Sequence, residues 1–146
     1  MTSTWVGDGV VATAWAAVLS GAPSTAVSMA RGENLLDSSA AAGTLLVPIS
    51  SPRALRLAAG GIAHGAISLW WGLVLSRALP RRRTVLWGAV AGLAIAALDL
   101  GVIGRRFPAI RDLDPGPQVA DHLAFGIVTA AAVRRSRESR RPRRGR

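Results

Sequence analysis

The chain has 146 residues, 50% of them hydrophobic, and its formal net charge of +10 rests on arginine alone, because it contains no lysine. A soluble domain of this length cannot bury so much apolar surface in one core, so the composition favours a membrane protein. The absence of cysteine excludes disulfides, thiolate metal sites and cysteine nucleophiles.

The first apolar stretch covers residues 5–30 and is long enough to cross a bilayer as a helix. Gly21, Ala22 and Pro23 interrupt it, and we expect them to kink or end the helix. Residues 40–49 are also largely apolar, but ten residues are too few to cross. This pattern predicts a short interfacial or re-entrant helix between the first and second spans.

Three more apolar stretches complete the predicted set of spans. Residues 57–76 and 84–104 predict the second and third spans, which a short arginine-rich hairpin joins. Residues 118–133 predict a fourth span that is short at 16 residues, although flanking arginines can snorkel and lengthen it. The predicted fold is an all-α bundle of four transmembrane helices, a single domain over residues 1–133.

Arginine placement predicts the orientation of this bundle. The hairpin between the second and third spans and the tail, residues 134–146, together hold 12 arginines, whereas the other side holds six. Because cytoplasmic loops are enriched in positive side chains, we expect both termini in the cytoplasm and the protein in the plasma membrane. The tail is expected to be disordered and to contact anionic lipid headgroups, with no specific nucleic-acid partner.

Small residues mark the faces through which the spans are expected to pack. The third span has Gly88, Gly92 and Ala96 at four-residue spacing, and Asp99 shares their face. The second span has a similar face, formed by Gly61, Gly65, Ser68 and Gly72. Such faces suit packing within the bundle, a homo-oligomer or a larger membrane complex.

Polar side chains from the last three spans gather at one depth. At about 1.5 Å per residue, the ionisable groups lie roughly 5–11 Å below the extracytoplasmic surface. The predicted polar intramembrane cluster consists of His64, Ser68, Asp99, Gln118, Asp121 and His122. Ionisable groups inside a span are costly, so the cluster needs a structural or functional explanation.

The simplest explanation is structural. Hydrogen bonds among the cluster members, or with Arg105 and Arg106, would fix the helix register.

A metal site is a second possibility, and its weak candidates for metal ligands are His64, Asp99, Asp121 and His122. Imidazole and carboxylate groups suit zinc, but the neighbours Asp121 and His122 diverge by about 100° on a helix, which opposes a shared ion.

Two functional explanations stay open. Histidine and buried carboxylates are suited to a proton, ion or metal transporter or channel. An intramembrane enzyme would use Ser68 beside His64, four residues apart on one helix, but no oxyanion donors accompany this pair. We therefore expect a non-catalytic membrane component or accessory subunit, without a catalytic residue or cofactor.

A resemblance to known proteins is carried by residues 79–84, 97–108 and 117–122, which read LPRRRT, ALDLGVIGRRFP and PQVADH. These stretches resemble uncharacterised small multi-pass membrane proteins of actinobacteria. The resemblance covers the second half of the chain, and it implies the membrane class without a substrate or site.

Overall fold

The computed structural model describes residues 4–140, apart from the side chains of Thr4, Trp5 and Asp8, and this range is helical without strands. Its helices are α1 (Thr4–Leu19), α2 (Ala22–Arg31), α3 (Asp37–Ala42), α4 (Arg53–Ala78), α5 (Thr84–Leu98), α6 (Pro108–Arg111) and α7 (Pro115–Ser139). Within residues 4–140, three helical stretches are long and apolar enough to cross a membrane, namely Gly9–Arg31, Arg53–Ala78 and Thr84–Arg106. The predicted all-α class is confirmed, and these three stretches coincide with the first three predicted spans.

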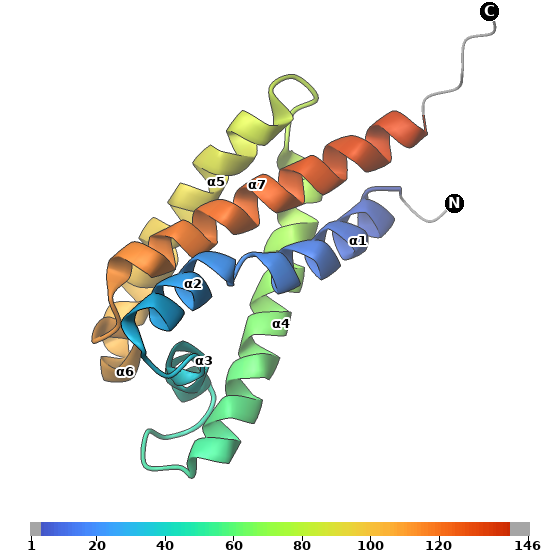
Figure 1. Ribbon diagram of the computed structural model, residues 1–146. Coiled ribbons are helices and arrows are strands. Elements are labelled where there is room, and N and C mark those ends of the chain that lie inside the picture. The colour runs from blue at the N-terminus through green and yellow to red at the C-terminus, as the bar shows by residue number, and fades with distance from the viewer. Residues whose placement is uncertain (1–3, 141–146) are drawn as a thin grey trace, which may run out of the picture.

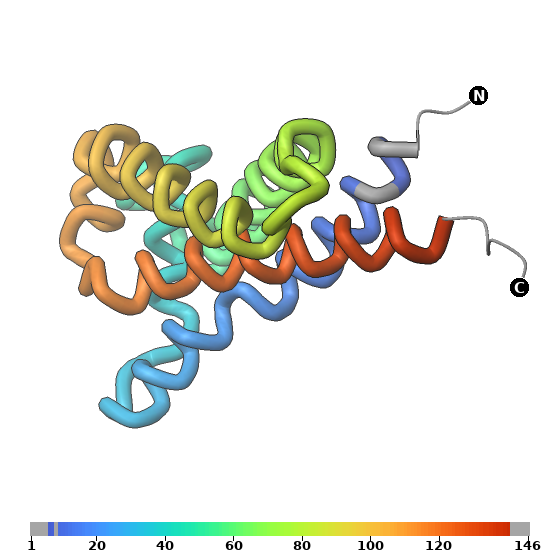
Figure 2. The backbone as a smooth tube through the Cα atoms, turned by 90° about the horizontal axis from the view of Figure 1, so that it is seen from above, coloured from blue at the N-terminus to red at the C-terminus, as the bar shows by residue number. Residues whose placement is uncertain are grey.

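Three of the long helical stretches, α1–α2, α7 and α5, lie alongside one another, and α4 crosses them steeply and contacts mainly α1 (Figure 1). In Figure 1, α7 lies between α1 and α5 and runs antiparallel to α5, and Figure 2 shows α1 crossing α7. The start of α1, the end of α7 and the α4–α5 hairpin lie at one end of the molecule, with α3 and α6 toward the other (Figure 1). The buried apolar core between these helices consists of Ala16, Leu75, Leu79, Ile95, Phe125 and Ala130.

The first span is broken, as its glycine and proline predict. The first helix ends at Leu19, and α2 begins at Ala22 with Pro23 in its first turn. Proline cannot donate a backbone hydrogen bond to the preceding turn, so the two helices meet at an angle. The break leaves backbone groups of both helices without intrahelical partners.

The third span continues beyond α5 through a π-helical turn, Asp99–Ile103, and a 3₁₀ turn, Gly104–Arg106. The Gly104 N–H donates to the carbonyl oxygen of Asp99, five residues earlier. A π turn adds one residue to the helical turn and locally widens the helix. The sequence did not predict this irregularity, which begins at the one charged residue of the predicted third span.

The backbones of α5 and α7 touch through glycines. A Cβ on Gly88 would lie 2.5 Å from the carbonyl oxygen of Gly126, and a Cβ on Gly126 would lie 2.9 Å from the Cα of Gly92. Ala130 is fully buried beside Gly88. The predicted small face of the third span therefore does contact another helix, and that helix is α7.

The predicted small face of the second span is only half correct. Ser68 and Gly72 pack on α1, where the Thr13 hydroxyl lies 3.4 Å from the carbonyl oxygen of Ser68. A Cβ on Gly61 or Gly65 would instead meet open space. The first helix ends about level with the middle of α4, so it leaves this part of the face uncovered.

The short segment before α4 folds back on that helix. Here α3 is followed by a 3₁₀ turn, Gly43–Leu45, and the two pack on the first turns of α4. A Cβ on Gly43 would lie 2.9 Å from the Cα of Arg56, and Arg53 pairs with Asp37 at 2.9 Å. The helical part covers residues 37–45, so it begins three residues before the predicted segment, 40–49.

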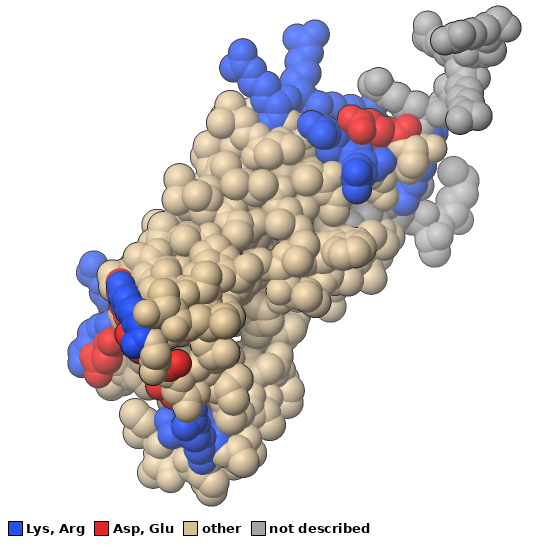
Figure 3. Space-filling model, in the orientation of Figure 1, with Lys and Arg blue, Asp and Glu red and all other residues tan. Residues whose placement is uncertain are grey.

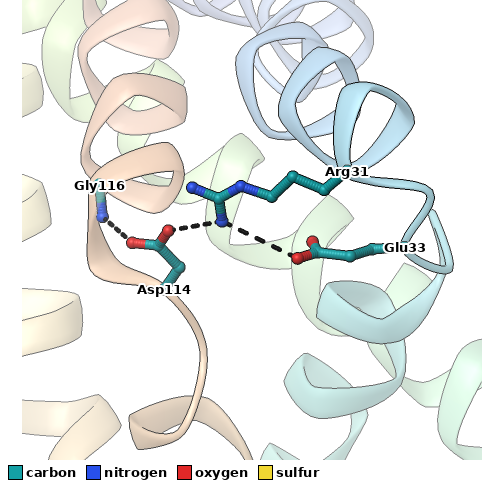
Figure 4. Close-up of polar contacts among 4 residues, drawn as sticks. All are labelled: Arg31, Glu33, Asp114 and Gly116. Atoms are coloured by element: carbon teal, nitrogen blue, oxygen red, sulfur yellow. Dashed lines mark hydrogen bonds and ion pairs between the residues drawn. The ribbon is translucent and has the colours of Figure 1, made fainter.

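Charged side chains gather at the two ends of the bundle, with an uncharged band between them on the face shown in Figure 3. At one end, Arg31 pairs with Asp114 at 2.8 Å and lies 3.8 Å from Glu33 (Figure 4). The Gly116 N–H also donates to Asp114, at 3.0 Å, so Asp114 caps α7. The hydrogen bonds from Arg31 and Gly116 lower the pKa of Asp114 below its ordinary value.

The prediction of a disordered tail is wrong for its first residues, because α7 continues to Ser139. The Arg137 guanidinium donates to the carbonyl oxygens of Ser76 and Leu79, at 2.8 and 2.9 Å. These oxygens belong to the end of α4, where helical carbonyls lack partners. Arg137 therefore caps α4 and holds the last turns of α7 in place. Residues 141–146 lie outside the described residues.

Candidate functional site

A cavity of about 140 Å³ opens at the break between α1 and α2. The middle of α4, the end of α5 and the start of α7 form its other walls. All six residues of the predicted polar cluster line it, together with Ser20, Gly21, Ile67, Trp71, Ile95 and Phe125. The structure thus brings together side chains from three helices that the sequence placed at one depth.

His64 reaches from α4 to the end of α1. Its Nε2 lies 3.1 Å from the carbonyl oxygen of Ala17, in the last turn of that helix. A carbonyl oxygen only accepts, so Nε2 carries the proton in this contact. His64 therefore satisfies one of the backbone acceptors that the break exposes.

Asp121 binds a backbone group on the α2 side of the break. Its carboxylate accepts a 2.9 Å hydrogen bond from the backbone N–H of Ser24, in the first turn of α2. The residue at the N-cap position of α2 is Gly21, which has no side chain to cap the helix. Asp121 therefore supplies from α7 the cap that α2 lacks, where a negative charge also suits the helix dipole.

His122 and Asp99 form the third contact of the cluster. The Nδ1 of His122 lies 2.7 Å from the Gln118 carbonyl oxygen, and its Nε2 lies 3.4 Å from the Asp99 carboxylate. Because Nδ1 must donate to a carbonyl oxygen, a neutral ring would present a bare nitrogen to the carboxylate. A proton on Nε2 as well would make this contact an ion pair between the His122 ring and the Asp99 carboxylate.

In the described part of the chain, the four candidate metal ligands do not converge on one ion site. Among the described residues, no three His, Asp or Glu side chains gather closely enough to hold an ion. Asp121 turns toward α2, whereas the adjacent His122 turns toward Asp99. The divergence of neighbouring residues on one helix accounts for this separation.

The Ser68 and His64 pair is likewise not assembled as a catalytic dyad. The described contacts of His64 join its ring to the Ala17 carbonyl and not to the Ser68 hydroxyl, and Ser68 is 4% exposed. Sequence reasoning missed Ser24 and Ala17, because their backbone groups, not their side chains, take part. The signal that pointed to them was the Gly21–Pro23 interruption.

In comparisons with known proteins, no family model, no curated protein and no solved structure matches this chain.

Proposed function

We propose that this chain is a multi-pass protein of the plasma membrane with four crossings, the fourth made by α7. This helix has 25 residues, about 37 Å at 1.5 Å per residue, and it packs along α5. The hydropathy of α7 is lowered by Asp121, His122 and the arginines at its end. Asp121 and His122, however, face other helices. A helix that packs along a membrane span with its polar groups turned inward is suited to cross beside it.

The charge distribution supports cytoplasmic termini. In the sequence, the α4–α5 hairpin segment (residues 77–83) and the segment from residue 134 onward together have 12 arginines and one acidic residue, Glu138. The opposite end has six arginines, which four acidic residues offset, namely Glu33, Asp37, Asp112 and Asp114. The positive-inside rule then orients the arginine-rich end toward the cytoplasm.

Within the membrane, we propose that the polar cluster is structural and that the protein is a non-catalytic membrane component or accessory subunit. The observation that carries this proposal is that each ionisable group bonds a different helix or cap. His64 ties α4 to α1, Asp121 ties α7 to α2, and His122 ties α7 to Asp99. In lipid, the backbone groups freed by a broken helix need such partners.

The test compares Asp121→Asn with Asp121→Ala in detergent-purified protein. Asparagine keeps an oxygen that accepts from the Ser24 N–H, whereas alanine removes it. We expect the alanine variant to lose about 0.5–2 kcal/mol of stability and the asparagine variant to melt close to the wild type. Equal destabilisation by both would contradict the capping role.

The exposed glycines of α4 support the accessory-subunit part of the proposal. Gly61 and Gly65 are four residues apart, and their Cβ positions face open space. Close approach of another transmembrane helix commonly uses this spacing. Native electrophoresis of mild-detergent extracts should show a species larger than the 15.1 kDa monomer, and Gly61→Leu should shift it toward the monomer. A monomer in the wild type would contradict this assembly.

The cavity supports a second candidate, a proton or small-ion pathway. Its volume of about 140 Å³ admits several water molecules beside Asp99 and Asp121. Broken helices at mid-membrane are also common at the ion sites of transporters. Proteoliposomes with a trapped pH indicator distinguish the two candidates, because a pathway requires flux that Asp99→Asn abolishes. Flux equal to that of empty liposomes would exclude proton conduction.

A further inference from the structure

A second hollow, on the outside of the bundle, combines apolar walls with two arginines. It lies between the end of α5, α6 and the start of α7, and its volume of about 440 Å³ falls in the usual range of about 300–1,000 Å³ for ligand sites. Leu93, Leu100 and Val119 are among its apolar lining residues, and Arg105 and Arg111 are its charged ones. We call it the α5–α7 groove. It is distinct from the polar cavity, although Gln118 lines both.

The arginines of the groove are available to an anion. Arg105 is exposed and forms no ion pair or hydrogen bond with another described residue. Arg111 is also exposed, and its Nε lies 3.5 Å from Asp112, a long contact that involves one nitrogen of the guanidinium. A guanidinium presents several N–H donors in a planar fork, which matches the oxygens of a phosphate group.

The groove also has the length of one lipid leaflet. Leu93 and Arg105 are 12 residues apart on one helical rod, about 18 Å, close to the roughly 15 Å of half a bilayer core. Between them, Gly101 has open space at its Cβ position, so no side chain fills the groove there. An acyl chain that starts at the arginines can therefore follow the apolar wall toward Leu93.

We propose that the α5–α7 groove binds one anionic glycerophospholipid. Arg105 and Arg111 contact the phosphate, and one acyl chain lies between α5 and α7, across Gly101. This inference rests on the membrane location proposed above, because only there does the groove face lipid.

The test is native mass spectrometry of the detergent-purified protein, titrated with phosphatidylglycerol and separately with phosphatidylcholine. We expect one phosphatidylglycerol to bind at least about tenfold more tightly than phosphatidylcholine, since each arginine near the headgroup contributes to anionic selectivity. The double variant Arg105→Gln/Arg111→Gln should lose this preference. The matched control is Arg106→Gln, an exposed neighbour outside the groove lining, which should retain it.

Gly101→Leu tests the acyl chain separately, because it fills the groove and leaves both arginines in place. We expect weaker phosphatidylglycerol binding at an unchanged melting temperature. Unchanged phosphatidylglycerol binding in Gly101→Leu would refute the proposed acyl-chain contact. Equal competition by glycerophosphoglycerol, which lacks acyl chains, would do the same and would indicate a site for phosphate alone.

Alkaline carbonate extraction distinguishes failure of the proposed membrane location from failure of the proposed lipid site. Release of the protein would refute the membrane location, whereas a retained protein without phosphatidylglycerol preference would refute the lipid site alone.

Discussion

Replacing Gly126 by alanine is expected to destabilise the protein, whereas the same change at Gly61 is not. A Cβ on Gly126 would lie 2.9 Å from both the Cα and the N of Gly92, short of the 3.4 Å at which ordinary contact begins. It would also overlap the carbonyl oxygen of Gly88. These neighbours are backbone atoms of α5, so the change must push the two helices apart.

The magnitude follows from two opposing effects. Overpacking of a tight contact costs about 1–3 kcal/mol, and replacing glycine by alanine in a helix returns up to about 1 kcal/mol. At Gly61 the added Cβ meets nothing within 4 Å, so only the favourable effect remains. The two variants should therefore shift stability in opposite directions.

The assay is the apparent melting temperature of the purified monomer, measured by circular dichroism in a detergent that removes any partner helix from the Gly61 and Gly65 face. For a chain of this size, each kcal/mol corresponds to roughly 2–4 °C. Gly126→Ala should melt several degrees below the wild type, and Gly61→Ala at or slightly above it. If both variants melt at or above the wild type, the close backbone contact between α5 and α7 is refuted.

Three further predictions concern polar contacts. Arg137→Ala should lower the free energy of unfolding by about 1.5–3 kcal/mol, because two carbonyls at the end of α4 lose a charged donor. Arg134→Ala is the control and should change the melting temperature little, because Arg134 forms only an exposed ion pair with Glu138. His64→Ala should cost about 0.6–1.7 kcal/mol, and a full recovery in His64→Gln, which can still donate to the Ala17 carbonyl, would support the capping role. Folding lowers the pKa of Asp114 below its unfolded value of about 3.8. The ionised Asp114 carboxylate therefore stabilises the fold fully at a pH above 3.8, and this stabilisation is lost as the pH falls through the folded-state pKa. The melting temperatures of wild type and Asp114→Asn should accordingly differ at neutral pH and converge in strong acid, and a difference independent of pH would contradict the ion pair with Arg31.

The periodic features of this fold could be predicted from the sequence. The apolar stretches indicated the first three long helices, and the four-residue spacing of Gly88 and Gly92 indicated the face that contacts α7. Asp99 was predicted to point at a partner helix, and it lies beside His122 of α7. These features follow from the periodicity of a helix, which can be recognised in a single sequence.

Features that depend on the ends of helices could not be predicted in this way. The partners of His64 and Asp121 are backbone groups at the α1–α2 break, and the partners of Arg137 are carbonyls at the end of α4. Which side chain satisfies a free backbone group depends on where the helices cross. The open space at Gly61 could not be predicted for a similar reason. The sequence pattern shows which way a helix face points, but not where the helix that packs on it ends.

The most direct test of four membrane crossings is cysteine labelling, for which a chain without cysteine is well suited. Single cysteines at Asn34, Arg82, Asp112 and Ser139 would be treated with a membrane-impermeant maleimide in intact cells and after permeabilisation. Asn34→Cys and Asp112→Cys should be labelled in intact cells, and Arg82→Cys and Ser139→Cys only after permeabilisation. Labelling of Ser139→Cys in intact cells together with Asp112→Cys would mean that α7 does not cross, and it would contradict the proposed topology.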